Sequence, residues 1–240
     1  MPLPDEVQAV AAALRDGLQD ALGDGLAGLF VYGAALFPHP EAWMLDFDFH
    51  ALVEQPLAAA ECESVRAVYA ALAARSELGR ELDGYFVLLA DATKAEPPVH
   101  QLDRSMRDEA WALHRAHVHA GRYRVICGMD PREIVPVPTW PELDAGLRAE
   151  LAFILTHPDA TAFGVLNGAR ILASYDRRDV VLSKYEAAQW ALRALPSYWH
   201  DLLRAAVRTY ERAPLELDDA ALRDGWAGFV ALVRAEMPAT

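Results

Sequence analysis

The sequence predicts an α+β protein in which a mixed sheet with helices is followed by a C-terminal helical bundle. Apolar segments typical of strands alternate with helical segments over the first half of the chain, whereas nearly all of the sequence after residue 140 has helical periodicity. The stretch Pro136-Val137-Pro138 lies between the part with alternating strands and helices and the part with helical periodicity alone. We therefore expect two domains, at residues 1–138 and 139–240.

The elements of the first domain follow from local patterns. Residues 45–53 alternate between apolar and polar side chains, which is typical of a strand with one buried face. Residues 34–44 hold two prolines and are expected to form a loop. Strands are expected at residues 29–32, 45–53, 85–89 and 124–127, and helices at 5–22, 56–76 and around Trp111 and Leu113.

The second domain is predicted to be entirely helical. Ser183 is a candidate N-cap and Pro196 ends the same helix. Three tryptophans at helical spacing among leucines are expected in the core: Trp190, Trp199 and Trp226. The predicted helices are 143–156, 161–174, 184–195, 198–212 and 219–236.

Composition restricts the class of protein. Hydrophobic residues make up 53% of the 240 residues and no apolar run approaches the ~20 needed to cross a bilayer, so a cytoplasmic protein without a membrane partner is expected. Cys62 and Cys127 fit neither a metal spacing nor a disulfide framework and are expected to be reduced, buried thiols. The pattern is compatible with a monomer or a small homo-oligomer.

The net charge of −13 argues against a nucleic-acid partner, because phosphate backbones are bound by basic surfaces. An acidic surface also raises the local concentration of cations and so suits a small cationic substrate. The alternative is that the charge serves solubility alone.

Asp46 and Asp48 are the strongest candidate site residues. On a strand their side chains share one face, about 6.5 to 7 Å apart at Cα, and hard carboxylate oxygens are the ligands that Mg²⁺ prefers. The alternative is that they line the solvated face of an edge strand. The preceding Val31-Tyr32-Gly33 favours a site, because a glycine at a strand end lets backbone amides approach a phosphate.

The order Tyr32-Gly33, a short loop and Asp46-Phe47-Asp48 resembles the Gly-Ser…Asp-x-Asp signature of nucleotidyltransferases with the polymerase-beta fold. The resemblance implies that the two aspartates bind Mg²⁺ and that Gly33 contacts a nucleoside triphosphate. The family's serine is Ala34 here, which keeps the backbone amide but lacks the hydroxyl. Weaker nucleotide binding, or loss of activity, is the expected consequence.

A second set of motifs resembles the helical domain of the aminoglycoside adenylyltransferases that modify streptomycin and spectinomycin. It comprises residues 165–172, residues 183–192 and Leu195-Pro196, and the segments before it, 128–131 and 135–138, resemble that family's bridge between domains. The resemblance implies ATP contacts from Arg170 and Lys184, with Tyr185 beside them. The alternatives are a surface arginine and a first-turn lysine.

The family's general base, a further carboxylate on the next strand, does not align cleanly. The expected position is Gly84, with Asp83 one residue away and Glu81 behind it. Because a shift of one residue on a strand reverses the face, Asp83 suits the role only if the alignment slips or the strand starts after it.

Other polar residues are open to two interpretations. The stretch that binds the drug's amines in the family retains only Asp159, which suggests a different acceptor. His50 shares the face of Asp48 and is interpreted as a satisfied histidine rather than a metal ligand. His114, His117 and His119 lack the i, i+4 spacing of a helical zinc site and are interpreted as surface residues.

The function expected from these features is Mg²⁺-dependent transfer of AMP from ATP to a hydroxyl of a small molecule, with an aminoglycoside-like acceptor as one candidate. The alternative is a catalytically impaired protein of the same fold that binds a nucleotide or a partner, motivated by Ala34 and the displaced third acid. A tRNA-directed transferase is disfavoured by the charge of −13.

Overall fold

The computed structural model describes residues 3–38, 46–157, 161–211 and 219–238. These residues form two compact units, one ending at Glu142 and the other beginning at Leu143. Helix α5 (Trp140–Thr156) contains this division and starts just after the boundary expected at residue 138. Among the described helices, none combines the length and apolarity that crossing a bilayer requires.

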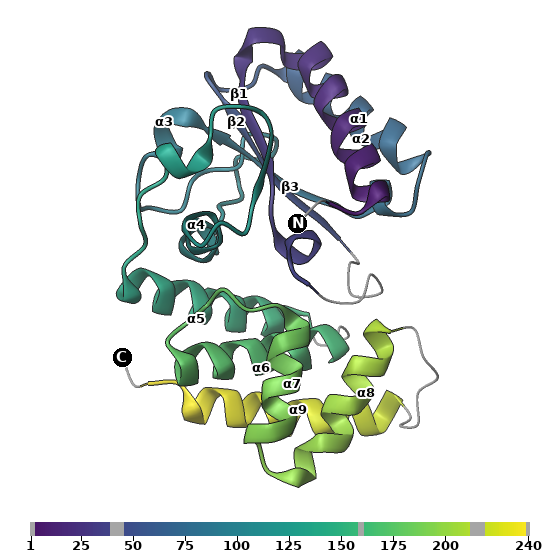
Figure 1. The fold of residues 1–240 in the computed structure, drawn as a ribbon, viewed down its shortest axis with the longest axis vertical. Helices are drawn as coiled ribbons and strands as arrows, with labels where there is room; N and C mark the ends of the chain where they lie inside the picture. Colours follow the sequence, from purple (N-terminus) through teal and green to yellow (C-terminus); the bar gives the residue numbers. More distant parts are fainter. Residues whose placement is uncertain (1–2, 39–45, 158–160, 212–218, 239–240) are drawn as a thin grey trace. The chain divides into compact units, whose positions relative to one another are not determined.

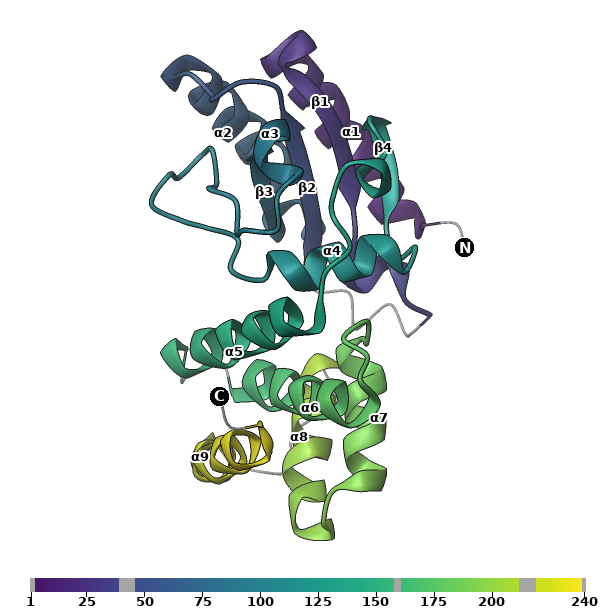
Figure 2. The same cartoon turned by 90° about the vertical axis from the view of Figure 1, so that its left-hand side faces the viewer.

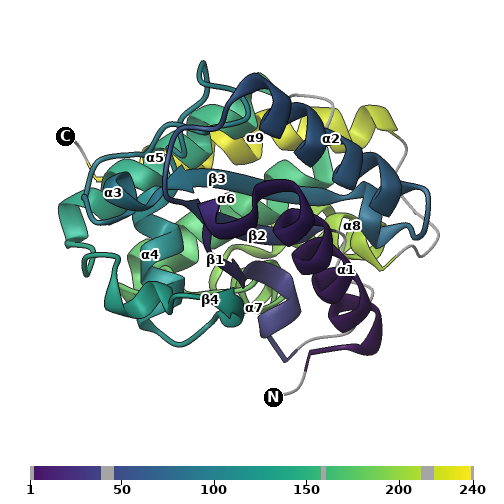
Figure 3. The same ribbon diagram turned by 90° about the horizontal axis from the view of Figure 1, so that it is seen from above.

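The first unit is built on a mixed four-stranded sheet with the order β3-β2-β1-β4 (Figure 3). Its strands are β1 (Leu26–Val31), β2 (Phe47–Val53), β3 (Leu82–Leu88) and β4 (Arg124–Gly128). β1 is antiparallel to both β2 and β4, whereas β2 and β3 are parallel. All four strands occur where sequence periodicity predicts them.

One face of this sheet is covered by α1 (Asp5–Leu22) and α2 (Ala59–Ala73), which lie side by side (Figure 1). The spacing of apolar residues in α1 predicts one buried stripe, and this is confirmed: Val7, Leu14 and Leu18 are all buried against this face. From β2, Phe47 and Phe49 point into the same core, as strand alternation requires.

The opposite face of the sheet carries a second core. It is formed by Phe30 of β1, Leu52 of β2 and Val87 of β3, with Trp111 from α4 (Trp111–His119) and Ala92 from the short helix α3 (Leu89–Ala92). Asp48 and His50 belong to this face by the alternation of β2. The core on the first face is thus apolar, whereas the second face combines buried apolar and polar side chains.

The second unit is helical, as predicted, and its helices are drawn in Figure 2. After α5 they are α6 (Thr161–Arg177), α7 (Lys184–Ala194), α8 (His200–Tyr210) and α9 (Asp219–Glu236), with α6 in contact with α7, α8 and α9. Gly164 and Gly168 lie against the rings of Trp226 and Phe229, so small residues on α6 admit the aromatic side chains of α9.

Several details differ from the sequence prediction. α2 begins at Ala59 rather than at Pro56. The Glu61 side chain accepts a hydrogen bond from the Ala58 amide, which caps the N-terminus of the helix at Ala58. β3 begins at Leu82 instead of residue 85, so Asp83 lies inside the strand. Leu45, most of the 34–44 loop and Asp159 lie outside the described residues.

The predicted core tryptophans and thiols are only partly buried. Of the three tryptophans, Trp226 is buried, whereas Trp190 and Trp199 keep part of their surface exposed. The indole N–H of Trp190 donates to Asp176, which requires that edge to lie near the surface. Cys62 and Cys127 are free thiols, as expected, and both are half-buried.

Candidate active site

The acidic residues lie at the partly exposed end of the sheet face that combines apolar and polar side chains. Along β2, Asp48 is half-buried, whereas His50 and Leu52 are fully buried. Along β3, Asp83 is exposed and Val87 is fully buried. Asp46 is half-buried at a bend directly before β2. The carboxylates therefore stand at the open end of a face whose other end is closed.

The strand register places Asp83, not Gly84, beside Asp48. Asp48 pairs with Asp83 and Phe49 pairs with Gly84 in the parallel ladder of β2 and β3. Paired residues of neighbouring strands, about 4.8 Å apart, project to the same face. A Cβ on Gly84 would lie 2.1 Å from two atoms of the Phe49 ring, so this position faces the apolar core of α1 and α2.

Gly33 makes room for the Asp48 carboxylate. Its φ is +71°, and a Cβ built on it would lie 1.7 Å from Oδ2 of Asp48. The neighbouring Tyr32 amide donates to the Asp48 carbonyl at 3.1 Å, which fixes the backbone of the two segments together. Ala34 follows within a 3-10 turn, Gly33–Leu36, so its methyl group stands where the resembling family has a hydroxyl.

The pKa of Tyr32 is affected by burial and by the acidic residues of this face. Burial raises the pKa of its phenol well above the usual value, and Asp48, Asp108 and Asp83 raise it further. The hydroxyl therefore stays protonated at neutral pH. The half-exposed carboxylate oxygens of Asp46 and Asp48 suit Mg²⁺, which keeps waters and substrate oxygens in its shell.

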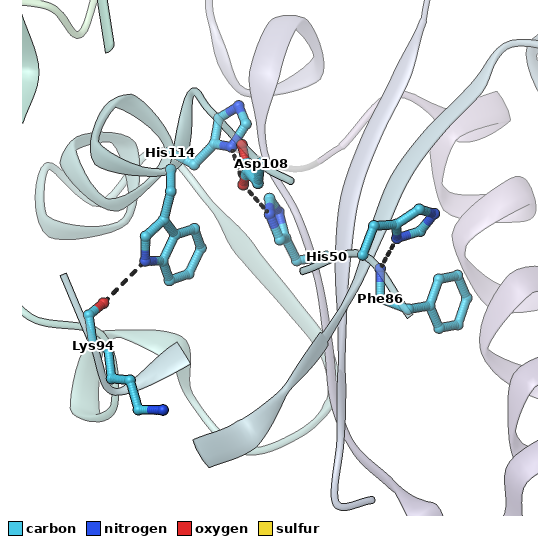
Figure 4. A network of polar contacts seen from close by, with 7 residues as sticks. His50, Phe86, Lys94, Asp108 and His114 are labelled. Carbon is cyan, nitrogen blue, oxygen red and sulfur yellow. Dashed lines mark hydrogen bonds and ion pairs between the residues drawn. The ribbon is translucent and has the colours of Figure 1, made fainter. Parts of the chain in front are cut away.

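Deeper on the same face, His50 and His114 share one carboxylate oxygen (Figure 4). His50 Nε2 lies 2.9 Å and His114 Nδ1 lies 2.8 Å from Oδ2 of Asp108. Burial lowers the pKa of His50, and the bond to Asp108 opposes this only in part. Burial acts to raise the pKa of Asp108, but the two histidines outweigh it and hold the pKa below its usual range.

Asp108 was missed by the sequence analysis. It lies 58 residues from His50, in an irregular segment whose Arg107-Asp108-Glu109 has the composition of an exposed turn, and no spacing pattern marks it. The interpretation of the α4 histidines as surface residues was wrong for His117, which is buried and packs edge-on against the Phe37 ring.

The candidate nucleotide-binding residues of the second unit already have intramolecular partners. Arg170 on α6 donates to Oε2 of Glu150 at 2.8 Å. The Lys184 ammonium lies 4.8 Å from the centre of the Phe163 ring and 5.5 Å from that of Tyr210. Tyr185 follows it on α7 and is half-buried.

Local sequence explains the position of Lys184. The Ser183 hydroxyl accepts from the Glu186 amide, and the Glu186 carboxylate accepts from the Ser183 amide, which together form a capping box. Lys184 is the first residue of α7 as a result. Phe163 and Arg170 are seven residues apart on α6 and thus share one helix face.

Comparison with known proteins gives a sequence match within the second unit and a similar fold for the whole chain. Residues 143–225 match the model of the aminoglycoside adenylyltransferase C-terminal domain. The structure is similar to that of spectinomycin adenyltransferase from Enterococcus faecialis, solved with ATP and spectinomycin, with a TM-score of 0.74 and 15% sequence identity over 95% of this chain and 99% of that chain. No curated protein matches the sequence significantly. The second unit thus resembles the aminoglycoside adenylyltransferase C-terminal domain in sequence, and the chain as a whole has the fold of that adenyltransferase.

Proposed function

We propose that the protein transfers AMP from ATP to a hydroxyl group of a small, aminoglycoside-like acceptor, with Mg²⁺ bound by Asp46 and Asp48. The observation that carries the proposal is the register of Asp83 with Asp48 at the partly exposed end of one sheet face, with Asp46 directly before the same strand. The similarity to a spectinomycin adenyltransferase solved with ATP supports the same class of reaction.

The residues present fit a magnesium ion. Asp46 and Asp48 offer hard oxygen ligands, and both are exposed enough for phosphate oxygens and water to complete the shell. When bound, the ion neutralises charge on the triphosphate and orients the α-phosphate for in-line displacement. Gly33 contributes by leaving the Asp48 carboxylate in place, which any side chain at that position would displace.

Asp83 is the proposed general base. The acceptor oxygen forms a bond to the α-phosphorus, the bond between the α-phosphorus and the bridging oxygen breaks, and pyrophosphate leaves. The hydroxyl proton passes to the Asp83 carboxylate, which is exposed and reachable by a bound acceptor. Its place beside Asp48 sets it next to the proposed metal ligands.

Arg170 and Lys184 are proposed to bind the triphosphate. A guanidinium fork and an ammonium stabilise the charge that develops on leaving pyrophosphate. The Lys184 ammonium lies over two aromatic rings, which help to orient it. Arg170 would keep its ion pair with Glu150 or exchange it for phosphate oxygens.

One observation favours a second candidate function, nucleotide binding without turnover. Ala34 removes the hydroxyl donor that the resembling family uses near the phosphates. The backbone of the Gly33–Leu36 turn is retained, so binding through amides is compatible with either function.

The test combines binding and turnover. Isothermal titration of ATP with Mg²⁺ into the wild-type protein and into Asp46→Asn/Asp48→Asn should give metal-dependent binding that the double variant loses. Labelled ATP incubated with a panel including streptomycin and spectinomycin should then give a nucleotidylated product. Metal-dependent binding with no product from any acceptor would support the second function, and no ATP binding by wild type would refute both.

A further inference from the structure

We propose that His50, Asp108 and His114 form a zinc site, separate from the proposed magnesium site. Within the part of the chain that the structure describes, these residues form the group of candidate ligands whose donor atoms all lie within 4.8 Å of one another. The inference does not depend on the proposed catalytic function, because the magnesium ligands are different residues.

The three donor atoms lie close together, with both imidazole nitrogens hydrogen-bonded to the Asp108 carboxylate between them (Figure 4). Oδ2 of Asp108 lies 2.9 Å from Nε2 of His50 and 2.8 Å from Nδ1 of His114. Tetrahedral zinc with bonds near 2.1 Å separates its ligand atoms by about 3.3 Å. The observed separations thus require an outward shift of roughly half an ångström. The Asp108 carboxylate must move away from both rings as the ion binds, and the partly exposed His114 ring has room to turn with it.

Neighbouring rings hold His50 in the ligand orientation. The Phe30 ring stacks on it at 5.3 Å between centroids with an interplanar angle of 7°, and Tyr85 stacks on it from β3 at 5.8 Å. The imidazole has 0% of its side chain exposed. Binding therefore requires little further ordering of His50, which favours metal affinity over a site assembled from mobile side chains.

The donor set selects the metal. Two imidazole nitrogens and one carboxylate match the ligands of zinc and other first-row transition metals, whereas magnesium and calcium prefer oxygen donors. Three protein ligands leave a fourth position for water. His114, with 19% of its side chain exposed, marks the side from which the ion and this water can enter.

The site would connect two parts of the chain that are far apart in sequence. His50 lies in β2, Asp108 in the segment before α4, and His114 in α4 itself. A bound ion would fix α4 to the strand that carries Asp48, two residues from His50. Metal binding should therefore stabilise the first unit against unfolding.

The experiment uses Co²⁺ as a spectroscopic probe of the zinc site. The full-length protein is dialysed against a chelator and then titrated with Co²⁺, with visible absorption and bound metal per chain measured together. We expect one Co²⁺ per chain with the absorption of a tetrahedral complex, displaced by Zn²⁺. Asp108→Asn and His114→Ala should each weaken binding by at least about tenfold.

Two control variants separate this site from other ligands. His119→Ala changes a histidine of the same helix whose Nε2 bonds to the Val135 carbonyl, and it should bind Co²⁺ as wild type does. Asp46→Asn/Asp48→Asn should also keep the tetrahedral signal while losing Mg²⁺-dependent ATP binding. Circular dichroism confirms folding of each variant. The proposal would be overturned if the wild type showed no tetrahedral absorption. It would also be overturned if folded Asp108→Asn and His114→Ala bound Co²⁺ as tightly as the wild type does.

Discussion

Asp48 and Asp83 are register partners on two parallel strands, so their carboxylates project side by side from one face of the sheet. The contribution of Asp83 can be isolated by Asp83→Asn, which keeps the shape of the side chain. Loss of a general base lowers kcat by about 10²- to 10⁴-fold, whereas an exposed substitution changes stability by no more than ~0.5 kcal/mol. Steady-state transfer kinetics and urea unfolding measure the two effects. An unchanged kcat would exclude Asp83 as the base.

Gly33→Ala should disturb the Asp48 carboxylate. The added Cβ would lie 1.7 Å from its Oδ2 in the present position, and the φ of +71° adds strain of about 1–2 kcal/mol. We expect loss of Mg²⁺-dependent ATP binding, measured by calorimetry. Gly121→Ala is the matched control, because Gly121 has a φ of +73° and no atom within 4 Å of its Cβ position. Equal effects of both variants on ATP binding would contradict the steric explanation.

Gly84→Ala should destabilise the first unit without removing a catalytic group. Its Cβ would meet the Phe49 ring at 2.1 Å, and overpacking of this kind costs about 1–3 kcal/mol. The unfolding midpoint in urea should fall accordingly. Gly25→Ala introduces the same methyl group where no atom lies within 4 Å and should leave the midpoint nearly unchanged. A Gly84→Ala protein as stable as wild type would mean that Phe49 moves aside at little cost.

His100 should make stability depend on pH. The Phe86 amide donates to His100 Nδ1 at 3.0 Å, so that nitrogen must be unprotonated, and burial lowers the pKa of the ring. Because the unfolded chain binds the proton more readily, the stabilisation is complete above the unfolded value of about 6.5 and is lost as the pH falls below it. Urea midpoints at several pH values should show this decline. His100→Asn keeps an acceptor without titrating and should reduce the slope; an unaltered slope would assign the dependence to other groups.

Lys184→Met should weaken ATP binding while keeping the apolar stem against Phe163 and Tyr210. Loss of one charge-assisted contact to phosphate corresponds to roughly tenfold in KM for ATP. Ser183→Ala is the structural control: it removes the N-cap of α7 and should cost about 1 kcal/mol of stability with a smaller effect on KM. A KM that changes only in Ser183→Ala would show that Lys184 has a structural role.

Local sequence patterns determined the elements of this protein. The alternation through β2 and the helical spacing of α1 depend on side chains within one turn or two strand positions of each other. The capping box at Ser183 likewise closes within four residues. The motif around Asp46 and Asp48 could be recognised for the same reason, since it lies within three consecutive residues, although β2 begins at Phe47 and leaves Asp46 at the bend before it.

Only the tertiary structure decided how these elements combine. The choice of Asp83 over Gly84 depends on the register of β3 against β2, which pairs Gly84 with Phe49 and leaves no room for a side chain there. The approach of Asp108 to His50 and His114 depends on the packing of α4 against the sheet. Contacts of this kind join residues far apart in the chain, so their geometry is determined by complementary packing and is not encoded in any local period.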